Sequence, residues 1–420
     1  MPADSENGWR QVKLKDVCRE ITVGHVGPMA SEYVEEGIPF FRSQNIQPFR
    51  VDLTDIKYIR PEFHQKLRKS AVSPGDVLVV RTGYPGTACV LPKDVPIANC
   101  SDLVIIRPSP DLDPWFLASL FNSAWGRGTV SGSLVGVAQQ HFNIGVAREM
   151  VITLPPISTQ RKVTSMLSAY DDLIENNTRR IKILEEMARA IYREWFVHFH
   201  FPGHEKIKLV DSPLGKIPEG WEVKRLGDIA AVNESSIKRG QEPAQIKYID
   251  ISSVSNGQIL RVEPVAFVDA PGRARRKVKH GDIIWSAVRP NLRAFCIVLD
   301  PHPELIVSTG FVVISPERVP YTYLYQVLTT DEFVDYLVNH TRGAAYPAVN
   351  TEDFENAQIV VPDAEVLSSY HDLVSDLYAL RQSLFEKSAR LSSTRDLLLP
   401  RLISGEIRMN NDAAFNGRKV

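Results

Sequence analysis

Residues 157–198 form the sequence ISTQRKVTSMLSAYDDLIENNTRRIKILEEMARAIYREWFVH, and this stretch decides the fold. Its mostly apolar seam positions recur at alternating steps of four and three, the a and d spacing of a two-helix coiled coil. At a rise of 1.5 Å per residue such a helix is about 60 Å long, more than a globular core needs. The seam positions are Val163, Leu167, Tyr170, Ile174, Asn177, Ile181, Leu184, Ala188, Ile191 and Trp195.

The same pattern returns near the end of the chain, each position 203 residues after its counterpart. Both apolar stripes are narrow, so we interpret the two helices as burying their stripes against each other. Two independent surface helices are the alternative, but the matching registers would then be a coincidence. The second set of positions is Val366, Tyr370, Leu373, Leu377, Leu380, Leu384, Lys387, Leu391, Thr394 and Leu398.

The segments that precede the two helices also repeat each other. Gly8-Trp9 matches Gly220-Trp221, and Gly75-Asp76 matches Gly281-Asp282, the latter pair before an apolar run in each half. The chain is therefore predicted to be an internal duplication of two half-chains of about 205 residues. Approximate two-fold symmetry would make the helices antiparallel. Further matches are 103–108 with 311–316, Asn143 with Asn350, and Leu154-Pro155 with Val361-Pro362.

Within each globular segment, short β-branched runs are broken by Gly, Pro, Asn and Asp, which is typical of strands and tight turns. Short helices are expected at 114–123 and 321–329. The predicted fold class is α+β, with two mostly-β domains, each followed by a long helix, and the two helices in an antiparallel coiled coil. In that arrangement Asn177 is expected to face Lys387 and to fix the register.

The predicted organisation has six parts. Pro155-Pro156 and Pro362 end the domains and begin the helices, because proline suits a first helical turn. The parts are a first globular domain at 1–155, a first long helix at 156–200, an exposed linker at 201–219, a second globular domain at 220–361, a second long helix at 362–404, and a polar tail at 405–420.

Composition places the chain among ordinary globular proteins, with 44% hydrophobic residues, 24% charged residues and a formal net charge of -1. No overall basic excess indicates nucleic acid, although a local positive face is enough for binding. The four cysteines are scattered, which is typical of a reduced cytoplasmic setting and not of a disulfide framework or zinc site. With no signal core and no apolar run of membrane-span length, the protein is expected in the cytoplasm without a membrane partner.

Motifs of catalysis are missing from the sequence. There is no phosphate-binding P-loop and no glycine-rich cofactor loop, and Leu154-Pro155-Pro156-Ile157 only superficially resembles the tetrad that amino-methyltransferases use. A nuclease centre at Asp211, Glu222 and Lys224 is disfavoured, since the matching segment 9–13 holds no acid. We therefore predict no catalytic residue and no bound cofactor.

A metal site is also disfavoured. His198, His200 and His204 lie beside aromatic residues at a helix end, where a packed or solvated cluster is the better interpretation.

Basic and polar residues gather at matching places in both halves. Such runs are ordinarily solvated faces, but their recurrence before and after the same strand favours a phosphate-contacting surface used twice. Arg, Gln and Asn are also the side chains that recognise guanine and adenine edges in the major groove. The candidates for DNA contact are Arg42, Asn45, Arg68, Lys69, Arg81, Thr82, Tyr84, Gln139, Gln140, Arg273, Arg275, Arg276, Lys277, Arg289, Asn291, Arg293, Arg342 and Tyr346.

The duplicated layout of domain and long helix resembles the specificity subunit of type I restriction-modification systems, over nearly the whole chain. One departure is the start of the second helix, Val361-Pro362-Asp363-Ala364, which lacks the double proline and the glutamine. The motifs that carry the resemblance are Ile217-Pro218-Glu219-Gly220-Trp221, Leu154-Pro155-Pro156 with Gln160, Trp195-Phe196-Val197, and Leu399-Pro400-Arg401-Leu402-Ile403-Ser404-Gly405-Glu406-Ile407.

The resemblance implies a non-catalytic, DNA-binding specificity subunit. Each domain would be a target-recognition domain for one half of a bipartite double-stranded DNA target. The helices would set the unread spacer and dock two modification methyltransferase subunits, and two ATP-dependent restriction subunits would complete the complex. S-adenosylmethionine, ATP and Mg would be used by those other subunits. The alternative function is a structural adaptor that binds proteins and not DNA.

Overall fold

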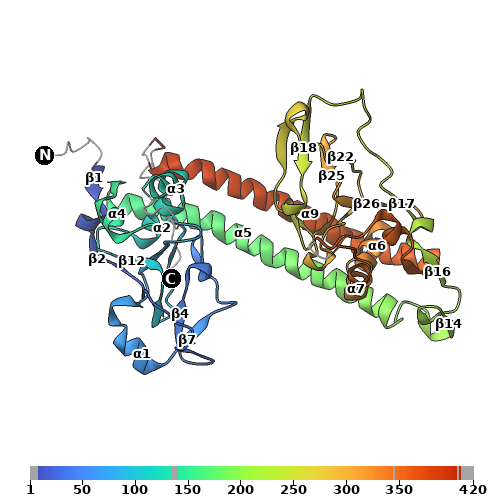
Figure 1. Ribbon diagram of the computed structural model, residues 1–420, viewed down its shortest axis with the longest axis horizontal. Helices are drawn as coiled ribbons and strands as arrows, with labels where there is room; N and C mark the ends of the chain where they lie inside the picture. Colours follow the sequence, from blue (N-terminus) through green and yellow to red (C-terminus); the bar gives the residue numbers. More distant parts are fainter. Residues whose placement is uncertain (1–7, 134–140, 344–345, 404–405, 408–420) are drawn as a thin grey trace. The chain divides into compact units, whose positions relative to one another are not determined.

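The computed structural model describes residues 8–133, 141–343, 346–403 and 406–407. These residues form two compact units (Figure 1). Unit 1 comprises the described residues up to Asn176 and those from Ser388 onward, and unit 2 comprises Asn177–Lys387. Each unit therefore contains one β-rich domain and a part of both long helices.

The domain of unit 1 is built from two sheets. One has the strand order β10-β9-β12-β2 and is antiparallel, and the other has the order β3-β7-β4-β11-β8, with β4 and β11 parallel. All four residues of β9 are buried, as expected for a central apolar run. The strands are β2 (Cys18–Val23), β3 (Tyr33–Val34), β4 (Ile38–Phe41), β7 (Lys57–Ile59), β8 (Ala71–Val72), β9 (Val77–Val80), β10 (Ala88–Val90), β11 (Ala98–Cys100) and β12 (Leu103–Pro108).

The domain of unit 2 repeats this topology, except that its second sheet has no described counterpart of β3. Its sheets have the orders β24-β23-β26-β17 and β21-β18-β25-β22, with β18 and β25 parallel, which confirms the predicted duplication. The strands are β17 (Ala230–Val232), β18 (Gln245–Ile249), β21 (Glu263–Ala266), β22 (Ala274–Lys277), β23 (Ile283–Ser286), β24 (Phe295–Ile297), β25 (Leu305–Ser308) and β26 (Phe311–Pro316).

A repeated Gly-Asp pair precedes the central strand of each domain. Gly75 and Gly281 have φ angles of +88° and +84°, a conformation that glycine adopts without strain. The carboxylates of Asp76 and Asp282 each accept a hydrogen bond from the backbone N–H three residues earlier, at 3.0 and 2.7 Å. Burial raises the pKa of both carboxyls. The pair thus recurs in both halves because it makes the same turn.

Short helices pack on these sheets, and two of them match the sequence prediction. Asp113 caps α2 by accepting a bond from the Phe116 N–H at 3.0 Å, with Pro114 in the first turn. The helices of unit 1 are α1 (Pro61–Lys66), α2 (Pro114–Asn122), α3 (Ala124–Ser131) and α4 (Ile144–Glu149), and those of unit 2 are α6 (Tyr321–Leu328), α7 (Asp331–Asn339) and α8 (Thr351–Glu355).

In each domain, a two-stranded ribbon brings the beginning and the end of the domain together next to the following helix. β1 (Arg10–Lys13) pairs with β13 (Val151–Leu154), and β16 (Glu222–Arg225) pairs with β27 (Gln358–Val361). The long helices follow directly: α5 spans Ile157–Tyr192 and α9 spans Ala364–Ile403.

The two long helices run antiparallel within each unit. In unit 2, Glu185 of α5 pairs with Arg381 of α9 at 2.6 Å. Trp195 lies in the π-helical turn Arg193–Val197 that continues α5, and its ring centroid is 6.0 Å from that of Tyr370. Partner numbers fall on α9 as they rise on α5, the direction that the sequence predicted. In unit 1, Arg395 of α9 bonds Asp171 of α5. This packing is consistent with the predicted antiparallel coiled coil.

The predicted seam fits α5 better than α9. Leu167, Asn177, Ile181 and Leu184 are buried, and Ile174 is half-buried. On α9, Leu384 is buried and Leu377 is half-buried.

Four of the ten predicted α9 seam positions are wrong, because Leu373, Leu380, Lys387 and Thr394 are exposed. Leu380 is 42% exposed and Lys387 is exposed, so Lys387 does not form the expected buried pair with Asn177. The buried stripe of α9 runs instead through Tyr370, Val374 and Tyr378, because this helix also packs against the core of the β-rich domain. A helix buried by two partners follows the 3.6-residue period and not the 3.5-residue heptad.

Residues 201–219 are less exposed than predicted. They contain a hairpin of β14 (Leu209–Ser212) and β15 (Gly215–Pro218). Phe201 and Ile217 are buried in one cluster with Trp221, whose ring centroid lies 5.2 Å from that of Phe201. The segment is therefore partly packed against the domain that follows it.

A buried glutamine anchors α5 to the first domain. The side-chain amide of Gln160 donates to the carbonyls of Asp111 and Pro155, at 2.9 and 2.8 Å, and accepts from the Asp113 N–H at 2.8 Å. At the start of α9, Asp363 instead accepts a bond from the Val366 N–H at 2.9 Å. The missing glutamine of the second half is thus replaced by an N-cap.

A buried arginine has the corresponding role in unit 2. Arg381 of α9 is 3% exposed, and besides Glu185 it bonds the carbonyl of Gly257 in the β19–β20 hairpin (Val254–Ser255 and Gln258–Ile259). Its guanidinium also lies 4.7 Å from the ring centroid of Phe385. One side chain therefore joins both long helices to the second domain.

We predict that Arg381→Ala lowers the free energy of unfolding of unit 2 by about 3 kcal/mol, because it leaves a buried carbonyl and a partly buried carboxylate without their partner. Thermal unfolding of the whole chain measures the change, with Arg390→Ala as the control, since Arg390 is an exposed arginine of the same helix. Equal melting temperatures for the two variants would show that Arg381 does not join the helices to the domain.

Candidate nucleic-acid interface

In unit 2, two polar loops singled out in the sequence lie against each other. Val288, just after β23, forms a β-bridge with Ala348. The Arg289 N–H donates to the Pro347 carbonyl at 2.8 Å, and the Val349 N–H donates to the Ala287 carbonyl at 2.9 Å. The loop after the central strand and the loop before α8 therefore form one continuous surface.

Unit 1 joins the matching loops in the same way. The Phe142 N–H donates to the Arg81 carbonyl at 3.1 Å, and the Arg81 side chain returns a bond from Nε to the Phe142 carbonyl at 3.2 Å. Gln139 and Gln140, which were predicted on this loop, lie outside the described residues.

A third segment completes the surface in each domain. In unit 1, the connection between β11 and β12 holds Asp102, whose carbonyl accepts from the Ser43 hydroxyl at 3.2 Å and whose carboxylate accepts from Thr82. Ser43 begins η2, a 3₁₀ turn that spans Ser43–Asn45 and follows β4. In this way the turn η2 lies beside the loop that follows the central strand.

The same three-way junction occurs in unit 2. The Ala287 N–H donates to the Gly310 carbonyl at 2.9 Å, and the Thr309 N–H donates to the Arg273 carbonyl at 2.7 Å. The equivalent 3₁₀ turn, η7 (Ile251–Ser253), packs so tightly here that a Cβ on Gly310 would lie 2.4 Å from an Ile251 side-chain carbon. Both domains thus assemble their candidate surface from the same three segments.

Some predicted contact residues are exposed on this surface. Tyr84 is 85% exposed and Tyr346 is 71% exposed, large values for aromatic side chains. The Arg289 guanidinium lies 5.0 Å from the ring centroid of Tyr346, a cation–π distance that holds the arginine in a fixed direction. Asn291 is exposed in the same turn.

The backbone of this turn is unusual. Arg289 and Arg293 flank the 3₁₀ turn η9 (Pro290–Leu292) and have φ angles of +49° and +54°. A left-handed conformation costs a non-glycine residue on the order of 1 kcal/mol, so the surrounding contacts must hold it. Those contacts include the ion pair of Arg293 with Asp331 and the bond from the Arg289 N–H. Such strain is common at functional sites.

Other predicted residues are occupied by partners within the chain. The Arg81 side chain is only 15% exposed and lies 3.5 Å from the Asp102 carboxylate. Arg342 makes two bonds to Asp353, at 2.7 and 3.0 Å, and Arg273 pairs with Asp250. In the isolated chain each of these arginines is paired with a carboxylate.

Only some of the basic residues of β22 are exposed and able to contact DNA. Arg275 lies over the Phe267 ring at 4.8 Å, and Arg276 is partly buried with its Nε unpartnered, so that burial lowers the pKa of Arg276. Lys277 is exposed, as are Arg68 and Lys69 of the short turn η3 (Arg68–Ser70) in unit 1. The exposed basic residues, Lys277 in unit 2 and Arg68 and Lys69 in unit 1, are the ones placed to contact phosphate groups.

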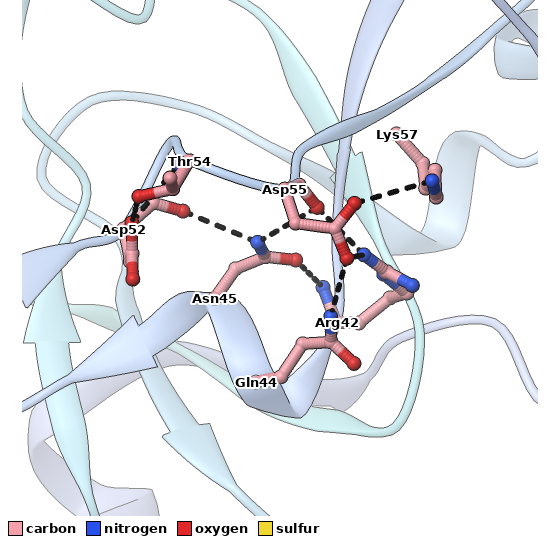
Figure 2. Close-up of polar contacts among 7 residues, drawn as sticks. All are labelled: Arg42, Gln44, Asn45, Asp52, Thr54, Asp55 and Lys57. Carbon is pink, nitrogen blue, oxygen red and sulfur yellow. Dashed lines mark hydrogen bonds and ion pairs between the residues drawn. The ribbon is translucent and has the colours of Figure 1, made fainter. Parts of the chain in front are cut away.

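Asn45 does not fit its predicted role as a candidate for DNA contact. It is buried, and its amide donates to the carbonyls of Asp52 and Asp55 at 3.1 and 3.3 Å and accepts from the Arg42 N–H at 3.0 Å (Figure 2). Its hydrogen-bonding capacity is thus used to fix the loop that follows β6 (Arg50–Val51).

Arg42 is likewise directed inward. It donates to the backbone carbonyl of Asp55 at 2.6 Å and to the Asp55 carboxylate at 3.0 Å (Figure 2). Bonds from Arg42 and from Lys57 hold the pKa of the Asp55 carboxyl below its usual range.

Sequence reasoning missed Gln44, which lies between these two residues and is exposed. A position-by-position comparison of the two half-chains could have drawn attention to it. Gln44 is the central residue of η2, and the central residue of the equivalent turn η7 is Ser252. Asp102 was also missed, although it connects three segments of the surface in unit 1.

The described residues offer no metal centre and no membrane-crossing helix. They contain no group of three or more His, Cys, Asp or Glu side chains placed to hold a metal ion. His200 instead bonds Glu194 at 3.0 Å, and His204 bonds the Phe201 carbonyl at 2.8 Å. None of the described helices is both long and apolar enough to span a membrane.

Comparisons with known proteins agree with this architecture. Residues 6–186 and 218–378 match the model of the type I restriction modification DNA specificity domain, once for each half. The chain is 28% identical over 270 residues to the specificity subunit of the type I restriction enzyme MjaIX from Methanocaldococcus jannaschii, and this match covers 62% of each of the two chains.

Two further proteins match over almost their full lengths. The specificity subunit of the type I restriction enzyme MjaVIII, from the same organism, is 23% identical over 413 residues, covering 96% of this chain and 94% of that protein. The crystal structure of the type I restriction-modification system S subunit from M. genitalium superposes with a TM-score of 0.58 at 13% identity, covering 98% and 99% of the two chains. With both of its halves matched by the domain model, this chain belongs to the type I restriction-modification DNA specificity family.

Proposed function

We propose that the chain is the subunit that recognises DNA in a type I restriction-modification complex, with each β-rich domain binding one half of a bipartite double-stranded target. The observation that carries the proposal is that both domains build the same three-segment surface and place different side chains on it. Two domains with the same backbone but different side chains at the contact surface would bind two half-sites of different sequence.

Equivalent positions of the second sheet and of the turn after it carry different side chains. The strand register pairs Phe40 with Lys57 in unit 1 and Tyr248 with Glu263 in unit 2. Immediately after β4 and β18, Arg42 corresponds to Asp250, and each is the N-cap of the 3₁₀ turn that follows. Both positions therefore carry opposite charges in the two domains, although the backbone is the same.

The long helices are proposed to set the unread spacer and to dock two modification methyltransferase subunits. Large apolar side chains remain exposed along both helices, and such residues are typical of surfaces that bind other proteins. They are Leu173, Ile183 and Met187 on α5 and Leu373, Leu380 and Leu397 on α9. Half-site centres about one DNA turn apart, roughly 10 base pairs, are expected for two domains that approach one face of a duplex.

Chemistry is proposed to lie in other subunits of the complex, since the chain itself provides recognition. The methyltransferase subunits would use S-adenosylmethionine on adenine, and two restriction subunits would use ATP and Mg for translocation and cleavage. The complex would act in the cytoplasm, where the DNA is. A structural adaptor that binds only proteins is the second candidate, favoured by the exposed apolar residues of the helices.

The salt dependence of DNA binding tests the proposal against the adaptor. We expect the full chain, co-expressed with its methyltransferase, to bind DNA with an affinity that falls steeply as salt rises. The double variant Arg68→Ala and Lys69→Ala should weaken binding to all sequences alike and reduce the log–log salt slope by up to about two units. Its control, Lys206→Ala with Lys208→Ala, removes two exposed charges of the linker hairpin region and should leave the slope unchanged. Salt-independent or absent binding would favour the adaptor.

Lengthening the helices tests their role as a spacer. One heptad inserted into each helix, after Asn176 and after Lys387, adds about 10 Å to each. The unread gap should then grow by about three base pairs at 3.4 Å per pair, with both half-sites unchanged. A heptad in one helix alone misaligns the pair and should abolish recognition. Altered half-sites with an unchanged gap would contradict the proposed division of labour.

A further inference from the structure

The exposed turn η2 presents a glutamine whose amide is fixed by a carboxylate. Gln44 Nε2 donates to Asp55 Oδ2 at 2.8 Å, and among the described residues no hydrogen-bond partner is found for Gln44 Oε1. Figure 2 shows the amide nitrogen toward Asp55 and the amide oxygen directed away from the cluster.

The chemistry of Asp55 allows only this orientation of the amide. An ionised carboxylate is a hydrogen-bond acceptor and has no donor, so it must face the NH₂ group of Gln44 and not its oxygen. Arg42 and Lys57 keep Asp55 ionised, since both bond its carboxylate and lower the pKa of the carboxyl. Rotating the amide by half a turn would place two acceptors against each other.

Hydrogen bonds hold the loop that carries Asp55 in place. Asn45 bonds the carbonyls on both sides of the loop, at Asp52 and at Asp55, and Arg42 bonds the Asp55 carbonyl again at 2.6 Å. Arg42 and Asn45, two of the residues predicted from the sequence as candidates for DNA contact, therefore position a third residue. Gln44, unlike them, is exposed.

The hydrogen-bonding groups left to Gln44 match one base. The NH₂ group has a second hydrogen besides the one used by Asp55, and Oε1 is a free acceptor. In the major groove, adenine offers the N6 amine as a donor and N7 as an acceptor, the pattern that a glutamine binds with two bonds. A guanine would present two acceptors and would leave Oε1 opposite its O6 or N7.

We propose that Gln44 is a specificity-determining residue that recognises an adenine in the first half-site, and that Asp55 is its positioning residue. The inference rests on the proposed DNA-recognition function and assigns an atom-level role within it. The corresponding residue of the second domain, Ser252, has no amide and does not share this preference.

The test begins with the sequence preference of the wild-type chain, co-expressed with its methyltransferase, in a selection from randomised duplex DNA. Gln44→Ala should reduce the preference for adenine at one position of the first half-site by about tenfold, which is the discrimination expected for one bidentate contact. The other positions and the second half-site should stay as they are. Gln65→Ala is the matched control, since Gln65 is an exposed glutamine of the same domain, on α1.

The Asp55→Asn variant tests whether a loss of base preference can occur without a loss of stability. An asparagine can donate or accept, so Gln44 can rotate, and the preference at the same position should fall a few-fold while the melting temperature stays near that of the wild type. If Gln44→Ala leaves every position unchanged, or weakens binding to all sequences equally, the inference is wrong. If the wild-type complex shows no sequence preference at all, the proposed function fails first, and the two failures are thereby distinguished.

Discussion

The structure depends on the antiparallel contact between α5 and α9, and buried polar side chains connect that contact to the domains. In unit 2, Arg381 bonds Glu185 on the other helix and the Gly257 carbonyl in the domain. A buried guanidinium that lost these acceptors would be costly, so the hydrogen bonds permit only a narrow range of positions between helix and domain. In unit 1, Gln160 constrains the start of α5 in the same manner, with three hydrogen bonds to the domain. Apolar side chains make up most of the buried contact, and these polar contacts fix the position of each helix relative to its domain.

Duplication explains why the two domains agree in backbone and differ at the surface. The Gly-Asp turns, the central strands and the two-stranded ribbons recur because each is needed to make the fold. The turns η2 and η7 recur as turns, yet one carries Gln44 supported by Asp55 and the other carries Ser252 beside Asp250. A scaffold of this kind can change what it binds without changing how it folds. The same reasoning accounts for the stacked Arg289 and Tyr346, which have no equivalent stack in the described part of unit 1.

Sequence reasoning succeeded where periodicity and repetition carry the information. The seam of α5 followed from spacing, the duplication from repeated segments, and the direction of the helices from the two-fold symmetry that the duplication implies. It failed on α9, where Leu380 has the right spacing but faces solvent and the polar Arg381 is buried. A pattern of apolar residues cannot show that a guanidinium is bonded to a carboxylate and a carbonyl. It also failed at Asn45, which was a candidate for DNA contact but is buried and bonded to two backbone carbonyls. Local pairing of this kind depends on contacts distant in sequence, which a single chain does not reveal.

The most direct measurement is a map of methylated adenines in a host that expresses this chain with its methyltransferase, obtained by long-read sequencing. Two recognition domains held on one pair of helices should produce a split motif with an unread gap of fixed length, and replacing one domain by another should change one half of the motif only. A continuous motif, or no methylation despite a stable complex, would contradict the account, because one domain or both would then bind something other than DNA.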